Sequence, residues 1–129
     1  MKYLLDTCAV LWWWQDSPRL SQFAKEKIQN SNNEIYVSSV SAMEISTKVR
    51  LGKLTLSGRL AKDLGIAVST SGWQELPLRI KEAQIAGSLD WSHRDPFDRL
   101  LAVQAMQNRF ALLTCDPVFH DLSELKVAW

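Results

Sequence analysis

Four acidic residues of the chain lie just beyond short apolar runs of the kind that form buried strands. Asp6 follows the run at 3–5, Glu44 comes after 35–37, Asp116 follows 111–114, and Asp98 belongs to the acid-rich segment 95–99. In a parallel α/β sheet, the segments after the carboxyl ends of the strands gather at one edge, where ligands bind. Carboxylates that converge there repel one another unless a hard cation neutralises them. The pattern predicts a Mg²⁺ or Mn²⁺ site and a metal-dependent reaction on a phosphate ester.

Helix capping offers a second interpretation for most of these acids. Glu44 comes three residues after Ser41, a spacing that fits a capping box. Asp116 precedes Pro117, an order that suits a helix cap. Asp6 is harder to explain in this way, because it ends a strand that we expect to be buried and no lysine or arginine follows closely. Four acids at strand ends exceed what capping requires, which favours a shared metal ion.

The segment around Asp95 and Asp98 places two acids at one predicted helix start. Asp95 precedes Pro96, which suits an N-cap, and Asp98 falls in the first turn, where negative charge is favourable. Mg²⁺ keeps several waters and uses only one or two direct carboxylates, so some of the acids are expected to act through water.

Other residues with useful chemistry give weaker signals. Thr7 and Thr114 stand beside acids. One interpretation is that their hydroxyls orient a carboxylate or a water, and the other is that they are ordinary strand-end threonines. His93 precedes the acid-rich segment and either touches a phosphate or has a surface or packing role. Cys8 and Cys115 are expected to be buried free thiols, not a disulfide. The sequence has no Ser-His-Asp order, glycine-rich phosphate loop or CxxC pair.

Length and composition predict one domain, residues 1–129, with 47% hydrophobic and 22% charged residues. No apolar run approaches the roughly 20 residues of a membrane span, and the N-terminus lacks a signal-peptide pattern, so we expect a cytoplasmic protein without membrane contact. The net charge of +1 gives no global signature of nucleic-acid binding. Either a local basic rim or a solvated helix face is formed by Lys48, Arg50, Lys53, Arg59 and Lys62.

Three consecutive indoles, Trp12, Trp13 and Trp14, invite comparison with base-stacking surfaces. Successive residues on a helix point about 100° apart, so at most one or two of them can face RNA. We expect these side chains to pack in the core or at a subunit interface.

The elements that position these residues alternate between strands and helices. Strands are expected at 3–5, 34–38, 72–78, 110–114 and 125–128. Helices are expected at 9–14, 18–29, 39–51, 60–66, 80–87 and 96–108. This alternation predicts βαβ units and a three-layer α/β/α sandwich with a mainly parallel sheet.

Four segments of the chain, taken in order, resemble the motifs of the PIN-domain family. They are LLDT at 4–7, SSVSAMEI at 38–45, HRDPFDRLLA at 93–102 and LLTCD at 112–116. Each motif alone is weak, but the ordered set extends over essentially the whole chain. The branch that it most resembles is the VapC-type toxins of prokaryotic toxin–antitoxin pairs.

The resemblance implies a parallel sheet of four or five strands and Mg²⁺- or Mn²⁺-dependent endoribonuclease activity on RNA. It also implies a homodimer and inhibition by a small antitoxin whose tail enters the active-site groove. Carried over by position, the acids of the family, catalytic and metal-binding, fall on Asp6, Glu44, Asp98 and Asp116. Asp98 is preferred to Asp95 because the third acid of the family opens a helix of the form Asp-x-Leu-Leu/Ile-Ala. Cys115 departs from the family pattern, in which a more polar or basic residue is common.

Two other functions are alternatives to this one. A PIN-like module that binds RNA or protein without cutting is suggested by the near-neutral charge, whereas the presence of all four acids counts against it. Phosphoryl transfer through an aspartyl intermediate needs a lysine shortly after a late strand and an Asp-x-Asp start, and neither is evident. The RNA target, the antitoxin and the number of metal ions are left open by the sequence.

Overall fold

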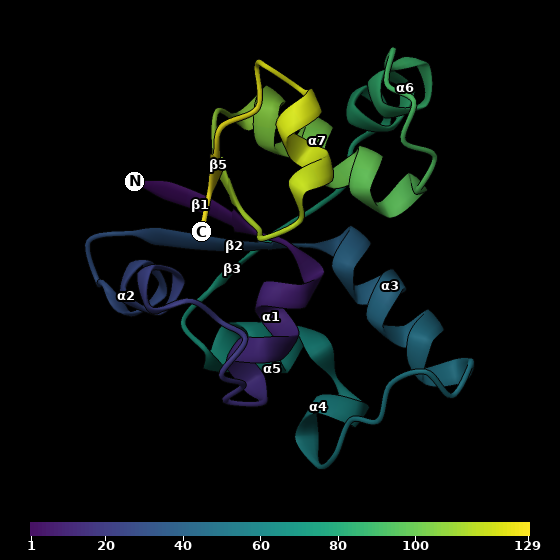
Figure 1. Ribbon diagram of the computed structural model, residues 1–129. Helices are drawn as coiled ribbons and strands as arrows, with labels where there is room; N and C mark the ends of the chain where they lie inside the picture. Colours follow the sequence, from purple (N-terminus) through teal and green to yellow (C-terminus); the bar gives the residue numbers. More distant parts are fainter.

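The computed structural model describes residues 1–129, except for the side chains of Arg59 and Ala61. Its centre is a five-stranded sheet in the order β3-β2-β1-β4-β5, in which each neighbouring pair is parallel (Figure 1). The strands are β1 (Lys2–Leu5), β2 (Glu34–Ser38), β3 (Gln74–Leu76), β4 (Ala111–Leu113) and β5 (Val127–Ala128). The predicted parallel sheet is therefore confirmed.

Helices fill the connections between successive strands, as parallel pairing requires. They are α1 (Thr7–Trp14), α2 (Gln22–Gln29), α3 (Ser39–Arg50), α4 (Arg59–Lys62), α5 (Leu64–Thr70), α6 (Ile80–Ser88), α7 (Pro96–Asn108) and the 3₁₀ helix η1 (Pro117–Asp121). Among the described residues, no helix combines the length and the apolar character needed to cross a bilayer.

The two faces of the sheet are covered by different helices. Successive side chains of a strand point to opposite faces, and β1 shows this clearly. Tyr3 and Leu5 belong to the core cluster that includes residues of α1, α2 and α5, whereas Leu4 belongs to the cluster that includes residues of α7 and η1. Figure 1 shows α1, α2 and α5 below the sheet and α7 above it. The α/β/α sandwich predicted from the sequence is confirmed.

The second helix begins later than the sequence predicted. We expected a start at Pro18, but α2 begins at Gln22, and the side chain of Ser21 accepts a hydrogen bond from the N–H of Ala24. The intervening chain is used to turn away from α1, because Asp16 takes a left-handed conformation with φ of 50°. Ser17 accordingly donates its N–H to the carbonyl of Trp12, as in the hydrogen-bonded end of a helix.

The region predicted as one helix at 60–66 contains two. Asp63 separates α4 from α5, and its carboxylate accepts a hydrogen bond from the N–H of Ile66, which caps the second helix. The strands expected at 72–78 and 125–128 are shorter in the structure, where β3 has three residues and β5 has two.

The consecutive indoles pack within the protein. The ring of Trp14 stacks on Trp73 at a centroid distance of 5.8 Å, and Trp13 contacts the same ring at 6.0 Å. Trp12 meets Trp129 edge to face at 5.7 Å, which fastens the C-terminus to α1. The core-packing interpretation of this run is confirmed.

Candidate active site

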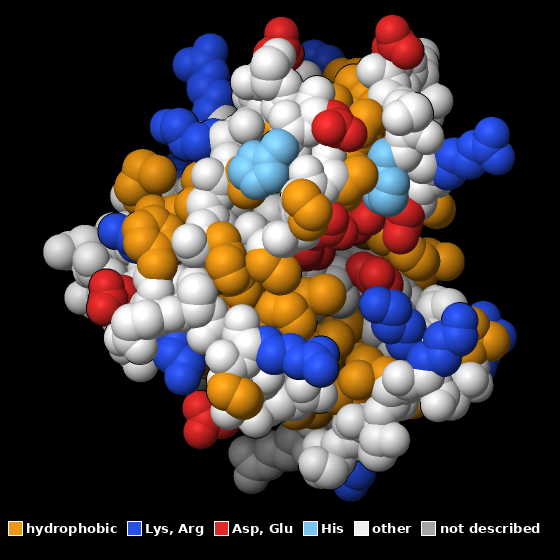
Figure 2. Space-filling model, viewed as in Figure 1, with side chains coloured by type: hydrophobic (Ala, Val, Ile, Leu, Met, Phe, Trp, Pro, Cys, Tyr) orange, Lys and Arg blue, Asp and Glu red, His pale blue; other side chains and the backbone are white. Residues whose placement is uncertain are grey.

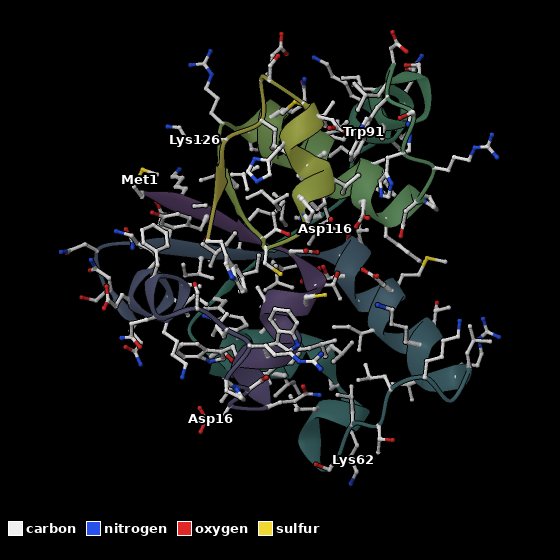
Figure 3. All side chains as sticks on the ribbon, in the orientation of Figure 1. Met1, Asp16, Lys62, Trp91, Asp116 and Lys126 are labelled. Carbon is white, nitrogen blue, oxygen red and sulfur yellow. The ribbon has the colours of Figure 1, made fainter. Side chains whose placement is uncertain are left out.

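The acids predicted to share a site follow three neighbouring strands. Asp6 comes directly after β1, Glu44 lies in α3 directly after β2, and Asp116 comes after β4, while Asp98 lies in the first turn of α7. Strands β2, β1 and β4 are consecutive in the sheet, so their carboxyl ends form one edge. Figure 3 shows Asp116 near the middle of the molecule, where α1 and α3 begin.

Asp6 is the most deeply buried of these acids, with 6% of its surface exposed. The hydroxyl of Thr114 donates a hydrogen bond of 2.7 Å to its Oδ2, so of the two roles that the sequence left open for Thr114, the structure supports that of orienting a carboxylate. Burial, with a smaller contribution from the charges of Asp98 and Glu44, raises the pKa of Asp6 to about 6 against the opposing effect of that hydrogen bond. These electrostatic effects show that three of the four acids share one neighbourhood.

Glu44 is not part of a capping box, contrary to one interpretation of the sequence. Helix α3 is capped by Ser38, whose Oγ accepts a hydrogen bond of 3.0 Å from the N–H of Val40. The hydroxyl of Ser41 instead pairs with that of Thr7 at 2.9 Å, a buried contact that ties α1 to α3. The hydroxyl of Thr7 therefore joins two helices, whereas its backbone N–H donates a hydrogen bond that lowers the pKa of Asp6. Glu44 lies well inside α3, where its side chain is free of any capping role.

The carboxylate of Glu44 is buried but only half satisfied. The residue is 8% exposed, and its Oε2 lies 3.1 Å from the Nζ of Lys48, one turn along the helix. Its Oε1 is buried without a hydrogen-bond partner among the described residues. Leaving a buried polar atom unpaired costs about 1–3 kcal/mol, more for a charged group, so such an atom calls for a ligand.

Asp95 and Asp98 have the different environments that the sequence suggested. Asp95 caps α7, because its Oδ1 accepts hydrogen bonds from the N–H groups of Phe97 (2.9 Å) and Asp98 (3.4 Å). The Oδ2 of Asp98 instead pairs with the Nε2 of His93 at 2.7 Å. Burial raises the pKa of Asp98, the hydrogen bond from His93 lowers it, and the charges of Asp95 and Glu44 raise it.

Among the described residues, one set of ligand atoms is compact enough to hold an ion without rearrangement. His93, Asp95 and Asp98 each offer an atom within 4.8 Å of the others. Asp6, Glu44 and Asp116 do not join that compact set, so the four predicted acids surround a wider space. Such spacing suits an ion that keeps water ligands or a pair of ions.

Asp116 has the capping role that the sequence allowed, and it also stands at the same edge as Asp6. Its Oδ1 accepts a hydrogen bond of 3.0 Å from the N–H of Val118 and so caps η1. Partial burial raises the pKa of the neighbouring Cys115, and the charges of Asp6 and Asp116 both add to this effect. One oxygen of Asp116 thus holds the helix end, and the other is available to a ligand.

The two cysteines are free thiols. Cys8 is partly buried, whereas Cys115 is exposed, so the prediction of a buried thiol is wrong for Cys115. Burial, together with the charge of Asp6, raises the pKa of Cys8 to about 11. Both thiols are therefore protonated at neutral pH, and neither is suited to nucleophilic chemistry.

Arg99 supports the site in a way that the sequence analysis missed. Its guanidinium donates hydrogen bonds to the backbone carbonyls of Ala86 (2.9 Å), Trp91 (2.8 Å), His93 (2.9 Å) and Leu89. This fastens the segment before α7 to the helix that carries Asp98. The ring of Trp91 then packs against that of His93 at 4.9 Å. The only sequence signal was an arginine within a largely apolar helix.

The acids occupy a hollow with basic groups along one side. Figure 2 shows Asp and Glu side chains gathered in this hollow, with a histidine beside them and Lys or Arg side chains along its lower rim. Of the predicted basic rim, Lys48 pairs with Glu44, Arg50, Lys53 and Lys62 are exposed, and the side chain of Arg59 lies outside the described residues. Part of the rim thus borders the acids directly.

The donor set fits a hard divalent cation. Every predicted ligand offers carboxylate oxygens, which Mg²⁺ and Mn²⁺ prefer. Burial has already removed water from Asp6 and Glu44, and the orphaned Oε1 of Glu44 is available as a ligand atom. Of the four acids that the sequence led us to expect around such an ion, Asp6, Glu44, Asp98 and Asp116, Asp98 also belongs to the compact set with His93 and Asp95.

Comparison with known proteins agrees with this geometry. Residues 3–125 match the model of the PIN domain family. The chain belongs to the PIN domain family. This confirms the family resemblance inferred from the four sequence motifs. A comparison with curated protein sequences gives no significant match.

Solved structures of this PIN domain's fold include chains from several bacteria. A chain in the VapBC2 structure from Rickettsia felis, bound to a promoter DNA fragment, is 18% identical with a TM-score of 0.72, covering 99% of this chain and 98% of that one. A chain of VapBC-1 from nontypeable Haemophilus influenzae gives 18% identity and a TM-score of 0.71, with 99% and 97% covered. A chain of FitAcB from Neisseria gonorrhoeae is 20% identical with a TM-score of 0.56, covering 97% of this chain and 95% of that one. These likenesses show that the fold is shared over the whole chain.

Proposed function

We propose that this PIN domain, as a single unit of residues 1–129, is a divalent-metal-dependent endoribonuclease, the VapC-type toxin of a toxin–antitoxin pair. The observation that carries the proposal is the buried acid cluster at the sheet edge, in which the charges of Asp98 and Glu44 raise the pKa of Asp6 and the charge of Glu44 also raises the pKa of Asp98. A cluster of this kind is poorly suited to a purely structural role, because each charge is partly desolvated and the charges repel.

The proposed mechanism assigns distinct tasks to the residues of the cluster. Asp6, Glu44, Asp98 and Asp116 would hold Mg²⁺ or Mn²⁺, and an ion held there would supply activation of a water and stabilisation of the leaving oxygen of an RNA phosphodiester. Thr114 holds the carboxylate of Asp6 in one orientation through its 2.7 Å hydrogen bond. His93 holds that of Asp98, and Asp95 keeps the end of α7 in place so that Asp98 faces the hollow. Fixed carboxylates lower the cost of assembling the reactive geometry.

Two features support the toxin role. The solved structures of similar fold include VapBC complexes and a toxin–antitoxin complex from Klebsiella pneumoniae. An apolar pocket also opens between α3 and α5, and its lining includes Trp14, Val37, Ala42, Ile45, Leu64 and Val68. Such a surface suits an apolar segment of a small antitoxin. The proposal includes a homodimer that acts in the cytoplasm on an RNA substrate.

Cleavage of purified RNA by the purified protein tests the proposal. We expect cleavage with Mg²⁺ or Mn²⁺ and none in excess EDTA. The Asp6→Asn and Asp98→Asn variants should each lose about 100-fold or more in rate, because each removes a charge that acts on the bound ion. The matched control is Asp121→Asn, which removes the same charge from the exposed end of η1 and should cut like the parent.

Equal rates for the parent and both site variants would show that the proposed site is wrong. Calorimetry distinguishes the remaining alternative, a PIN-like module that binds RNA or protein without cutting. Absence of Mg²⁺ and Mn²⁺ binding at millimolar concentration would favour that module. The toxin role is tested separately, by asking whether the product of an adjacent small reading frame binds the protein and prevents cleavage.

A further inference from the structure

The arrangement of Lys48 beside the acid cluster differs from that of an ordinary helix ion pair. Most pairs at this spacing join two exposed side chains and stabilise a helix only weakly. Here the side chain of Glu44 is only 11% exposed, whereas the side chain of Lys48 is 39% exposed. A flexible lysine arm therefore reaches from the solvent side to a buried carboxylate, and its Nζ lies 3.1 Å from Oε2.

Lys48 stands close to more than one acid of the cluster: its Nζ pairs with Glu44, and it lies within electrostatic reach of Asp6. Among the described residues, Lys48 and His93 supply the nitrogen atoms within salt-bridge distance of the four predicted acids. Lys48 is thus the side chain whose positive charge is already available to Glu44.

A divalent ion would compete with the ammonium of Lys48 for the same carboxylate. The Oε1 of Glu44 has no partner among the described residues, but an ion bound there would stand close to the ammonium on Oε2 and would be repelled by it. When the ion binds, Lys48 has the freedom to swing back, because its side chain is partly exposed and unbranched. The ligand of matching charge that then approaches this rim is a phosphate of the substrate.

We propose that Lys48 is a movable counter-ion: it neutralises Glu44 in the metal-free protein and binds an RNA phosphate after a divalent ion has taken Glu44. The first half concerns metal binding alone. The second half rests on the proposed nuclease function, since it needs RNA as the ligand. Lys48 then has two partners in succession, and metal binding prepares the site for substrate.

Mn²⁺ binding measured by calorimetry at constant pH and ionic strength tests the first half. Lys48→Gln keeps most of the length of the side chain but not its charge, and we expect it to bind Mn²⁺ roughly three- to tenfold more tightly than the parent. Lys48→Arg should restore the affinity of the parent. Lys81→Gln is the matched control, because it removes the same charge from an exposed position on α6 and should leave the affinity unchanged.

Binding of a fluorescent single-stranded RNA in Ca²⁺, with the RNA checked to be intact afterwards, tests the second half. Lys48→Gln should bind the RNA several-fold more weakly, and its affinity should depend less steeply on salt, by roughly 0.7–1 in the logarithmic slope. A tighter metal site with weaker RNA binding is a combination that local structural damage does not produce, since damage weakens both.

The outcomes separate this inference from the proposed function. Unchanged or weaker Mn²⁺ binding in Lys48→Gln overturns the counter-ion, even if the parent cuts RNA. Tighter Mn²⁺ binding without any effect on RNA overturns the phosphate contact alone. Absence of Mn²⁺ binding in the parent and in every variant overturns both the counter-ion and the metal-dependent nuclease. If Lys48→Gln binds Mn²⁺ more tightly but the parent does not cut RNA, the counter-ion is upheld and the nuclease is rejected.

Discussion

At the residue scale, the buried carboxylate of Asp6 lowers the stability of the metal-free protein when it is charged, and the same carboxylate is a ligand for a cation. Burial raises its pKa from 3.8 to about 6, so the folded protein binds a proton there more tightly than the unfolded chain does. Between these two values the folded state holds more protons, and stability must therefore fall as the pH rises. Above about pH 6 the folded protein carries the full cost of ionising Asp6. A pKa shift of about 2 units corresponds to about 3 kcal/mol of unfolding free energy.

The Asp6→Asn variant makes this cost measurable. Below pH 4 the parent and the variant should have similar melting temperatures in EDTA, because the carboxyl of the parent is then neutral in both states. From pH 4 to pH 6 the variant should become increasingly more stable than the parent, and the difference should level off above that range. Thermal unfolding followed by circular dichroism measures the difference at each pH. A difference that is independent of pH would contradict the raised pKa.

Residue identities at the site were predictable where a local rule fixes them. The N-cap role of Asp95 follows from the proline beside it, and Asp6 could be singled out because a buried strand seldom ends on an unpaired acid. The pairing of Ser41 with Thr7 was not predictable, because it joins residues 34 positions apart whose contact depends on how α1 and α3 pack. That contact, and not a capping box, explains the position of Ser41.

At the element scale, a helix was predicted well where local sequence signals fix its ends, and poorly where the path of the chain decides them. Helix α7 has the bounds that the sequence indicated, Pro96–Asn108, because its cap, its proline and its apolar residues all give consistent local signals. The start of α2 was misplaced because Pro18 lies in the turn that follows the left-handed Asp16. Two serine positions, 17 and 21, could each have capped the helix, and only the path of the chain decides between them.

Arg99 is the clearest test of how an element supports the site. Lysine at this position keeps the charge but cannot reproduce hydrogen bonds to four separate carbonyls from a planar guanidinium. Arg99→Lys should therefore lower the free energy of unfolding by about 2–3 kcal/mol, as measured by urea denaturation. Amide hydrogen exchange in the segment 89–93 should quicken as well, because its anchor on α7 is lost.

The control for this change is Arg94→Lys, which makes the same substitution at an exposed position in the segment before α7. It should change the free energy of unfolding by less than about 0.5 kcal/mol. If Arg99→Lys behaves like this control, the guanidinium does not hold the segment, and the orientation of His93 must come from its packing against Trp91.

At the scale of the whole molecule, the sheet order explains why distant residues meet. Strands β1, β2 and β4 are neighbours, and β1 is central in the order β3-β2-β1-β4-β5. Asp6, Glu44 and Asp116 follow these strands and are thus brought to one edge, where Asp98 joins them from the first turn of α7. Alternation of strands and helices was enough to predict the layers. The strand order was not predicted, because it depends on which connections cross the central strand.

An ion held by residues from such distant parts of the chain should stabilise the entire fold. If Mn²⁺ binds only the folded protein, a concentration of 100 times the dissociation constant adds about 2.7 kcal/mol to stability. For a domain of this size that corresponds to a rise in melting temperature of about 10 °C. Asp6→Asn should lose most of this rise while melting higher than the parent in EDTA at pH 7, whereas Asp121→Asn should keep the full rise. An equal rise in Asp6→Asn would place the ion elsewhere, and the compact group of His93, Asp95 and Asp98 would then be the next site to test.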